Sequence, residues 1–303
     1  MSLYQSMQEL IGNTPLVRLN HLGFSESMQV YAKLELYNPA GSVKDRIGKY
    51  MIEDARNREM LRPGDTIIEA TAGNTGIGIA FAALNQGYKL IFTVPEKFSQ
   101  EKQTLLRALG AEIINTPLEE GMAGAIRKAE ELRAAIPNSV TLEQFKNGSN
   151  PLAHYETTGP EIYKDLNGSI DYVVAGAGSG GTFSGILKYL KEKNPDVKGV
   201  LADPIGSTIG GGEHADYEIE GIGNDFIADT MDMSLVDKVI KVSDTEAYAE
   251  VKNIAKYEGI FAGSSSGAAL AAVRKLAETV CCGKIVVIFP DRGDRYFGKH
   301  IYG

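Results

Sequence analysis

Strands and helices alternate along most of this 303-residue chain. Short apolar runs typical of buried strands recur, and most are followed by a longer segment with a helical pattern. The predicted strands are Val30–Leu34, Thr66–Glu69, Lys89–Val94, Glu112–Ile114, Tyr172–Ala175, Gly199–Ala202 and Ile285–Phe289, and the clearest helices are Ser99–Leu109, Gly121–Ala135 and Ser243–Tyr257. This alternation predicts an α/β fold in which helices cover both faces of mostly parallel sheets. Such sheets bind ligands at the carboxyl ends of their strands.

Two segments in different halves of the chain resemble each other. Residues 66–84 read TIIEATAGNTGIGIAFAAL and residues 172–190 read YVVAGAGSGGTFSGILKYL, so each combines a strand, a small-residue loop and an apolar helix. A cluster of turn residues, Asn147–Pro151, lies between them. The chain is long enough for two domains of ordinary size. We therefore expect two α/β domains, residues 1–150 and 151–303, with a ligand loop in each.

Composition excludes several classes of protein. The formal net charge of −8 argues against a nucleic-acid-binding protein. The N-terminus lacks the pattern of a signal peptide and no apolar run reaches membrane-spanning length, so we expect a cytoplasmic protein without membrane contact. The four histidines are scattered, which predicts no metal site. Cys281 and Cys282 are adjacent and precede an apolar run, so we expect them to be buried and structural rather than paired.

One lysine stands directly behind a Pro/Gly turn, in the segment NPAGSVKDR at residues 38–46. The amphipathic run that follows predicts a helix, which places Lys44 at the helix N-terminus. The positive end of the helix dipole and desolvation both lower the pKa of an amine, leaving it able to attack a carbonyl group. The alternative is a solvated lysine beside Asp45.

Three small-residue loops each precede an apolar helix. Residues 69–76, EATAGNTG, carry hydroxyl and amide groups that can hold a carboxylate or cap the helix. Residues 176–182, GAGSGGT, can hold a compact phosphate through backbone N–H groups. This loop also satisfies GxGxxG, with Asp203 following, so dinucleotide binding and an NAD-dependent dehydrogenase remain open. Residues 263–267, GSSSG, form the third loop.

The lysine and the three loops, in this order, resemble the fold-type II pyridoxal-phosphate enzymes, specifically the cysteine synthase and cystathionine β-synthase family. The resemblance runs from IGNTPL at residues 11–16 to PDRGDRY at residues 290–296. It implies two doubly wound, mostly parallel-sheet domains with the cofactor, pyridoxal 5′-phosphate, between them. It also implies a homodimer that acts on small amino acids.

The resemblance implies a role for each residue of the site. Lys44 forms the Schiff base with the cofactor and moves the substrate's α-proton, while Asn74 bonds the ring hydroxyl and Ser265 meets the pyridine nitrogen. The residues that cradle the phosphate are Gly178, Ser179, Gly180, Gly181 and Thr182. Those that hold the substrate carboxylate are Thr71, Ala72, Gly73, Thr75 and Gln144.

Two departures from the cysteine synthase pattern bear on specificity. Where those enzymes usually read PTSGNTG, this chain has Ala72, which leaves only a backbone N–H at that position. The segment EGIGNDF at residues 220–226 looks more like the EGIGxDF of cystathionine β-synthases than the GIGAGF of cysteine synthases. Gly221, Asn224 and Asp225 are therefore expected to receive the amino-acid end of homocysteine, the alternative being a loop cap.

The function predicted from the sequence is β-replacement on serine or O-acetylserine. The expected product is cystathionine from homocysteine, with cysteine from sulfide as the near alternative and a serine/threonine dehydratase as a weaker one. We expect neither a haem segment nor a regulatory domain. The sequence leaves open which donor and which acceptor are physiological.

Overall fold

The computed structural model describes residues 3–71, 73–96 and 100–302 and divides into two compact units. Unit 1 contains residues 1–9 and 44–149, and unit 2 contains residues 10–43 and 150–303. The expected domain limits place residues 10–43 in the N-terminal domain instead. These residues join unit 2 because β2 (Met28–Leu34) pairs in parallel with β10 (Gly283–Phe289) along its whole length.

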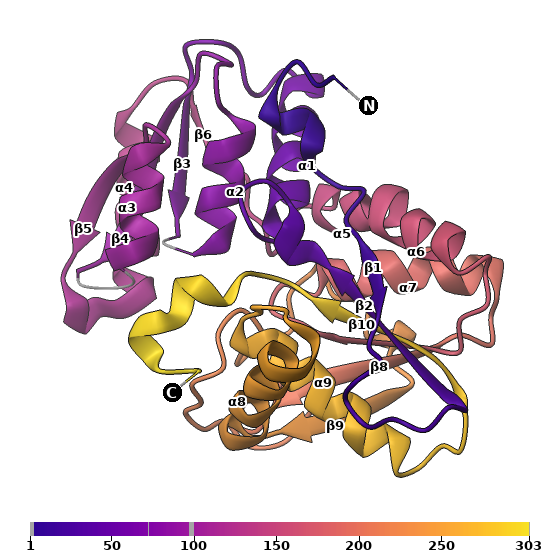
Figure 1. Cartoon of the computed structure of the whole chain (residues 1–303). Helices are drawn as coiled ribbons and strands as arrows, with labels where there is room; N and C mark the ends of the chain where they lie inside the picture. Colours follow the sequence, from indigo (N-terminus) through magenta and orange to yellow (C-terminus); the bar gives the residue numbers. More distant parts are fainter. Residues whose placement is uncertain (1–2, 72, 97–99, 303) are drawn as a thin grey trace. The chain divides into compact units, whose positions relative to one another are not determined.

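Unit 1 is built on a parallel sheet with the strand order β5-β4-β3-β6 (Figure 1). Its core contains Ile67, Ile68 and Phe92, which are fully buried. Its strands are β3 (Thr66–Ala70), β4 (Lys89–Pro95), β5 (Glu112–Thr116) and β6 (Ser139–Val140). Its helices are α1 (Lys44–Asn57), α2 (Asn74–Ala82), α3 (Gln100–Ala108), η3 (Leu118–Glu120) and α4 (Gly121–Ala135). The short η1 (Met7–Leu10) precedes them.

Helices α1 and α2 of unit 1 cross at close range. A Cβ added at Gly78 would lie 2.4 Å from the carbonyl oxygen of Lys44, and one at Gly48 would lie 2.5 Å from the carbonyl of Gly78. Only glycine allows this approach of two backbones. The first turn of α1, which carries Lys44, is therefore fixed against the helix that carries the Asn74 loop.

Unit 2 contains a larger sheet with the order β1-β2-β10-β7-β8-β9, in which β1 alone is antiparallel to its neighbour (Figure 1). The strands besides β2 and β10 are β1 (Leu16–Arg18), β7 (Tyr172–Gly176), β8 (Lys198–Pro204) and β9 (Lys238–Val242). The helices are η2 (Glu35–Tyr37), α5 (Ser149–Ala153), η4 (His154–Thr158), α6 (Gly159–Asp165), α7 (Gly181–Lys193), η5 (Met233–Leu235), α8 (Asp244–Asn253), η6 (Ile254–Glu258), α9 (Ser264–Ala277) and η7 (Gly293–Lys299).

Successive residues of β10 face different hydrophobic cores. Ile285 and Val287 pack in the cluster that contains α9, whereas Val286 and Ile288 pack in the cluster that contains α6 and α7. Alternate side chains of a strand point to opposite faces of the sheet, so helices cover both faces of this one. The predicted doubly wound α/β fold is confirmed.

The predicted burial of the cysteines is wrong. Cys281 and Cys282 are both exposed and unpaired in a disulfide, with their sulfur atoms 3.8 Å apart. The two residues lie in the turn before β10, and burial of that strand begins only at Ile285. Ser27 holds the turn, since its hydroxyl donates to the Cys281 carbonyl oxygen over 3.0 Å and its carbonyl accepts the N–H of Gly283 over 3.0 Å.

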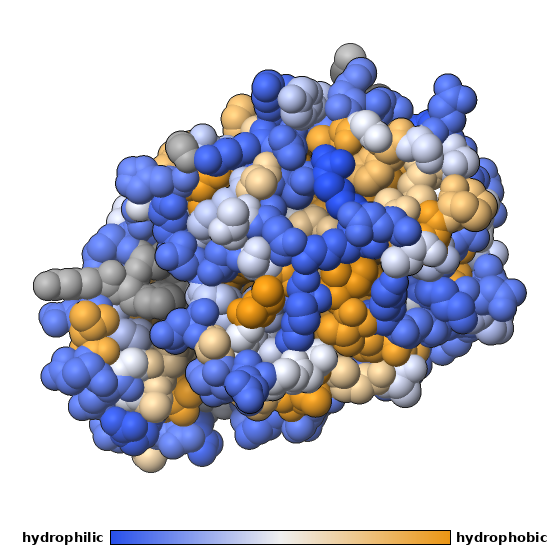
Figure 2. All heavy atoms as spheres, turned by 90° about the horizontal axis from the view of Figure 1, so that it is seen from below, coloured by the Kyte–Doolittle hydropathy of each residue, from blue (hydrophilic) through white to orange (hydrophobic). Residues whose placement is uncertain are grey.

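The surface mixes charged and apolar groups. Figure 2 shows one face, on which charged and polar side chains surround several apolar patches. Among the residues that the structure describes, every helix is too short or too polar to span a lipid bilayer. The same residues contain no group of three or more His, Cys, Asp or Glu side chains placed to hold a metal ion.

Candidate active site

Four helices begin at or beside residues that the sequence singles out. Helix α1 begins at Lys44, α2 at Asn74 and α7 at Gly181, and α9 begins one residue before Ser265. Helices α2 and α7 each follow the carboxyl end of a parallel strand, β3 and β7. This is the edge of an α/β sheet at which ligands bind.

Three of these helices start without a side-chain cap. In the described chain the N-cap residues of α2, α7 and α9 are Gly73, Gly180 and Gly263, which have no side chain that could cap the first turn. The N–H groups of an uncapped first turn are donors suited to an anion.

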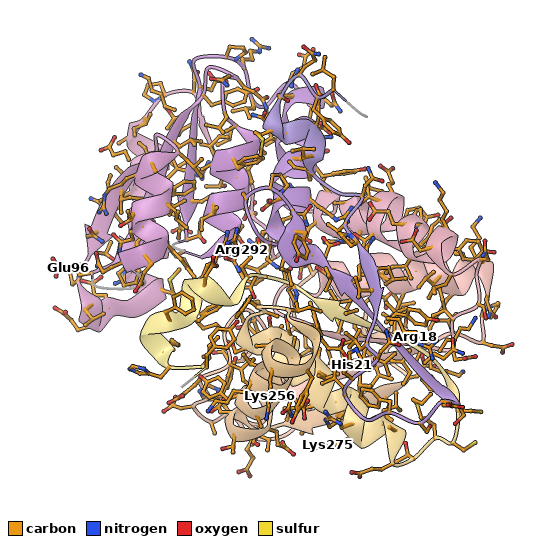
Figure 3. All side chains as sticks on the ribbon, in the orientation of Figure 1. Arg18, His21, Glu96, Lys256, Lys275 and Arg292 are labelled. Carbon is orange, nitrogen blue, oxygen red and sulfur yellow. The ribbon has the colours of Figure 1, made fainter. Side chains whose placement is uncertain are left out.

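Helix α8 shows the contrasting arrangement. Its capping box joins Ser243 and Glu246, with the Ser243 N–H donating to the Glu246 carboxylate over 2.8 Å. Lys275, labelled in Figure 3, extends from α9 to the same carboxylate at 2.6 Å. This N-terminus is closed by the protein's own side chains, whereas α2, α7 and α9 have glycine at the N-cap.

The substrate loop predicted in unit 1 lies against a residue from far along the chain. The Thr75 hydroxyl donates to Gln144 Oε1 over 2.7 Å, although the two residues are 69 positions apart. Gln144 reaches this place because β6, which precedes it, pairs with β3. Thr71 and Thr75 are both buried, and the N–H of Gly73 donates to the Thr71 hydroxyl over 3.3 Å. Ala72 lies outside the described residues.

The glycine loop of unit 2 has no room for side chains at three of its glycines. A Cβ at Gly178 would lie 2.9 Å from the Gly221 carbonyl oxygen, and one at Gly180 would lie 2.4 Å from Met231 Cβ. At Gly181 the added carbon would lie 2.0 Å from Asn150 Oδ1. Gly180 also has a φ of +79°, in the left-handed region that favours glycine. The loop therefore presents backbone to whatever it binds.

Side chains that the sequence does not single out support this loop. Asn150 Nδ2 donates to the Ser179 hydroxyl over 2.9 Å, and the Thr230 hydroxyl donates to the Ser179 carbonyl over 2.5 Å. His154 Nε2 lies 3.1 Å from the Thr182 hydroxyl. Asn150 is visible in the sequence only as part of the turn cluster taken as a domain boundary, and nothing near Thr230 or His154 marks either residue.

The serine loop and the Glu220–Phe226 segment are joined within unit 2. The N–H of Glu220 donates to the Ser264 hydroxyl over 3.0 Å. The N–H of Gly223 donates to the carbonyl of Ala177, in the glycine loop, over 2.7 Å. The segment that contains Gly221, Asn224 and Asp225 thus bridges the glycine and serine loops.

Asn224 and Asp225 differ in their surroundings. Asn224 is half-buried, and its backbone N–H donates to the Ser207 hydroxyl over 3.1 Å. Its side-chain oxygen accepts the N–H of Asp225 over 3.2 Å, as in a loop cap, while the Asp225 side chain is exposed. Gly221 has a φ of +86°, and a Cβ there would meet open space.

The C-terminal segment supports the serine loop. The hydroxyl of Tyr296, a buried residue of η7, donates to the Asp291 carboxylate, and burial raises the pKa of Tyr296 well above its ordinary value. The Asp291 carbonyl in turn accepts the N–H of Gly263 over 3.0 Å. The Tyr302 hydroxyl donates to the Ala262 carbonyl over 2.8 Å. These contacts hold the backbone directly ahead of Ser265, a buried residue.

Asp203 does not play the part that a dinucleotide site requires. Its carboxylate is buried, lies 2.6 Å from Lys241 Nζ and accepts the N–H of Gly210 over 2.9 Å. In a dinucleotide fold the acidic residue after the glycine loop bonds the ribose hydroxyls. Here Asp203 instead holds the loop after β8. The dehydrogenase alternative therefore lacks the acidic residue that would bind the ribose.

Comparison with known proteins agrees with this geometry. Residues 7–291 match the family model described as "Pyridoxal-phosphate dependent enzyme". The O-acetylserine dependent cystathionine beta-synthase of Bacillus subtilis is 52% identical over 303 residues, covering 100% of this chain and 99% of the relative. A cysteine synthase of Helicobacter pylori strain J99 is 46% identical over 300 residues, covering 98% of each chain.

A solved structure is also similar to this chain over its whole length. The crystal structure of the O-acetylserine dependent cystathionine beta-synthase from Helicobacter pylori superposes with a TM-score of 0.94 at 44% identity and covers 100% of both chains. The family match spans nearly the whole chain, a range that includes the lysine and all three loops. The chain belongs to the family of pyridoxal-phosphate dependent enzymes.

Proposed function

We propose that this enzyme catalyses β-replacement on O-acetylserine or serine and makes cystathionine from homocysteine. The observation that carries the proposal is the Glu220–Phe226 segment, which bridges the glycine and serine loops and contains the polar pair Asn224 and Asp225. The relatives named for cystathionine and for cysteine synthesis support the reaction type. Cysteine formation from sulfide is the second candidate, because sulfide needs no recognition by that segment.

The residues of the site fit pyridoxal phosphate. The glycine loop, open only to backbone contact, suits its compact phosphate, and the uncapped N-terminus of α7 supplies positive potential. Lys44 would carry the cofactor covalently, while Asn74 would bond its ring hydroxyl and Ser265 its ring nitrogen. When bound, pyridoxal phosphate supplies an electron sink for removal of the α-proton and loss of the β-substituent.

Groups of this chain would carry out the proton transfer and orient the substrate. Lys44 Nζ would take the substrate's α-proton and return it after the acceptor has added. Thr71, Gly73, Thr75 and Gln144 would orient the substrate carboxylate through hydroxyl, backbone and amide donors. A neutral Ser265 hydroxyl at the ring nitrogen would leave that nitrogen unprotonated, which would favour elimination over transamination.

Replacing both Asn224 and Asp225 with alanine is expected to weaken cystathionine formation by roughly tenfold to a hundredfold in kcat/KM, since a polar contact to the distal end of homocysteine is worth about 1–3 kcal/mol. Cysteine formation from sulfide should change much less, because sulfide has no distal group. The measurement is the ratio of the two kcat/KM values in the wild type and in the double variant.

A control variant and a stated contrary result complete this test. Asp229→Ala removes an exposed carboxylate a few residues further along and should leave the ratio unchanged. An unchanged ratio in the double variant, or a wild type that ignores homocysteine, would favour the cysteine synthase assignment instead.

We further propose that the enzyme is a cytoplasmic homodimer acting on small amino acids. Exposed free thiols at Cys281 and Cys282 suit a reducing compartment. Large apolar side chains such as Phe261 and Phe297 are 62% and 64% exposed, and exposed aromatics are typical of subunit interfaces. Sedimentation equilibrium is expected to give twice the 32.7 kDa mass of one chain. A monomer at micromolar concentration would contradict the homodimer.

A further inference from the structure

Strand β3 carries a carboxylate, Glu69, to which the proposed reaction gives no role. Glu69 is the penultimate residue of β3 and lies two residues before Thr71. It is partly buried, and its backbone is paired with that of Phe92 in β4. A carboxylate withdrawn from water at this position needs partners that stabilise its charge.

Those partners are two consecutive backbone amides. Glu69 Oε1 accepts the N–H of Leu142 and also the N–H of Glu143, the latter over 3.2 Å. Hydrogen bonds to an ionised acceptor are roughly twice as strong as those between neutral groups. One side chain of β3 thereby holds the segment that follows β6, more than 70 positions along the chain.

The segment that Glu69 holds adopts a conformation that requires support. Glu143 has a φ of +51°, in the left-handed region that residues other than glycine rarely adopt. Such backbone persists where the surrounding contacts determine it. The amides of Lys146 and Asn147 both donate to the Glu143 carbonyl over 2.9 Å, which closes the turn on its far side.

Gln144 follows directly on the two amides held by Glu69. Its Oε1 accepts the Thr75 hydroxyl over 2.7 Å, which places it in the expected substrate-carboxylate site. Glu69 therefore fixes the backbone directly ahead of Gln144, and Thr75 fixes the Gln144 side chain. Both fixing residues belong to the same strand–loop–helix unit, β3 to α2.

We propose that Glu69 is a positioning residue: its carboxylate, acting through the amides of Leu142 and Glu143, keeps Gln144 in place to bind the carboxylate of the amino-acid substrate. The proposal rests on the proposed function only in taking an amino acid as the ligand of the Thr71–Thr75 loop. The arrangement itself lies entirely within unit 1.

The charge state of Glu69 makes the proposal measurable. Burial raises the pKa of Glu69 to about 7, with the two amide hydrogen bonds opposing the shift and the negative charge of Glu143 adding to it. Glu143 is itself paired with Lys146 Nζ at 3.1 Å, and Phe92 opposite Glu69 in β4 has no charge. As the pH falls through 7 the carboxylate gains a proton, loses its charge and holds the two amides less tightly.

The first test compares the KM for the amino-acid donor in the wild type and in Glu69→Gln from pH 8 to pH 6. Glutamine keeps the accepting oxygen but cannot titrate. Because a group with a pKa near 7 goes from about nine-tenths ionised to about one-tenth over this range, we expect the wild-type KM to rise about tenfold relative to the variant's. The kcat at saturation should keep the same ratio throughout. The substrate amine titrates with both proteins, so its contribution cancels in the comparison.

The second test needs no turnover. Hydrogen exchange should show the amides of Leu142 and Glu143 protected in the wild type at pH 8, less protected by up to about tenfold at pH 6, and unprotected at both pH values in Glu69→Ala. In Glu69→Gln the protection should not depend on pH beyond the intrinsic exchange rate. Glu143→Gln removes the neighbouring charge, so it should move the wild-type transition to lower pH.

The outcomes separate the role of Glu69 from the proposed reaction. A KM ratio that does not change with pH, or full protection of both amides in Glu69→Ala, would overturn the positioning role. An enzyme that turns over no amino acid would overturn the proposed function, and the exchange measurement would still decide whether Glu69 holds the segment.

Discussion

Replacing Lys44 with alanine is expected to lower turnover by a factor of about 10² to 10⁴ or more, the usual contribution of a general base. Lys44 is the first residue of α1, and the crossing of α1 over α2 at Gly48 and Gly78 fixes its backbone. In the proposed reaction, loss of this amine would remove both the covalent attachment of the cofactor and the group that moves the α-proton. Steady-state kinetics with a saturating donor measures the loss of the group that moves the α-proton.

Borohydride reduction followed by peptide mass spectrometry measures the loss of the covalent attachment. The wild type should carry the reduced cofactor on the peptide that contains Lys44, and Lys44→Ala should carry none while still binding the cofactor non-covalently. Lys49→Ala, on the same helix, is the matched control and should behave as the wild type. Near-normal turnover in Lys44→Ala, or a label on another lysine, would exclude the assigned role.

Much of both sheets can be predicted from the sequence, because their central strands are apolar on both faces. The runs at β4, β8 and β10 are buried from both sides, so composition alone reveals them. Strands β1, β6 and β9 are missed for physical reasons. The first two have three and two residues, and β9, KVIKV, has lysines that break the apolar run. Helix α4 runs from Gly121 to Ala135, the bounds predicted from its pattern.

The proposed site residues can be predicted where a short local sequence pattern marks them. Lys44, Asn74, Gly181 and Ser265 can be recognised because each lies in a loop that opens a helix. The groups that support those loops are not local. The hydrogen bond from Thr230 to Ser179 spans 51 positions. No pattern in a sequence records a hydrogen bond between such distant segments, so Thr230, like Glu69, becomes visible only when the strands are paired.

Replacing Gly180 with alanine is expected to weaken retention of pyridoxal phosphate by roughly tenfold to a hundredfold. Two costs act on the folded loop. A left-handed backbone costs a residue with a side chain about 1–2 kcal/mol, and the added carbon, 2.4 Å from Met231 Cβ, must displace Met231 or the loop. Overpacking of this kind costs about 1–3 kcal/mol. Displacement of the loop would move the first N–H groups of α7 away from the proposed phosphate position, so affinity should fall together with stability.

Gly259→Ala separates the two costs. Gly259 has a φ of +68°, and a Cβ there meets nothing within 4 Å, so this variant bears the backbone cost without the steric one. Gly259 lies at the end of η6, outside the three small-residue loops and the turn that precedes Lys44. Urea unfolding should show both variants destabilised, with Gly180→Ala the more affected. Cofactor absorbance after dialysis should fall only in Gly180→Ala, because only there do the N–H donors of the loop move. Equal retention in the two variants would mean that the phosphate is held elsewhere, and the role given to the glycine loop would have to be abandoned.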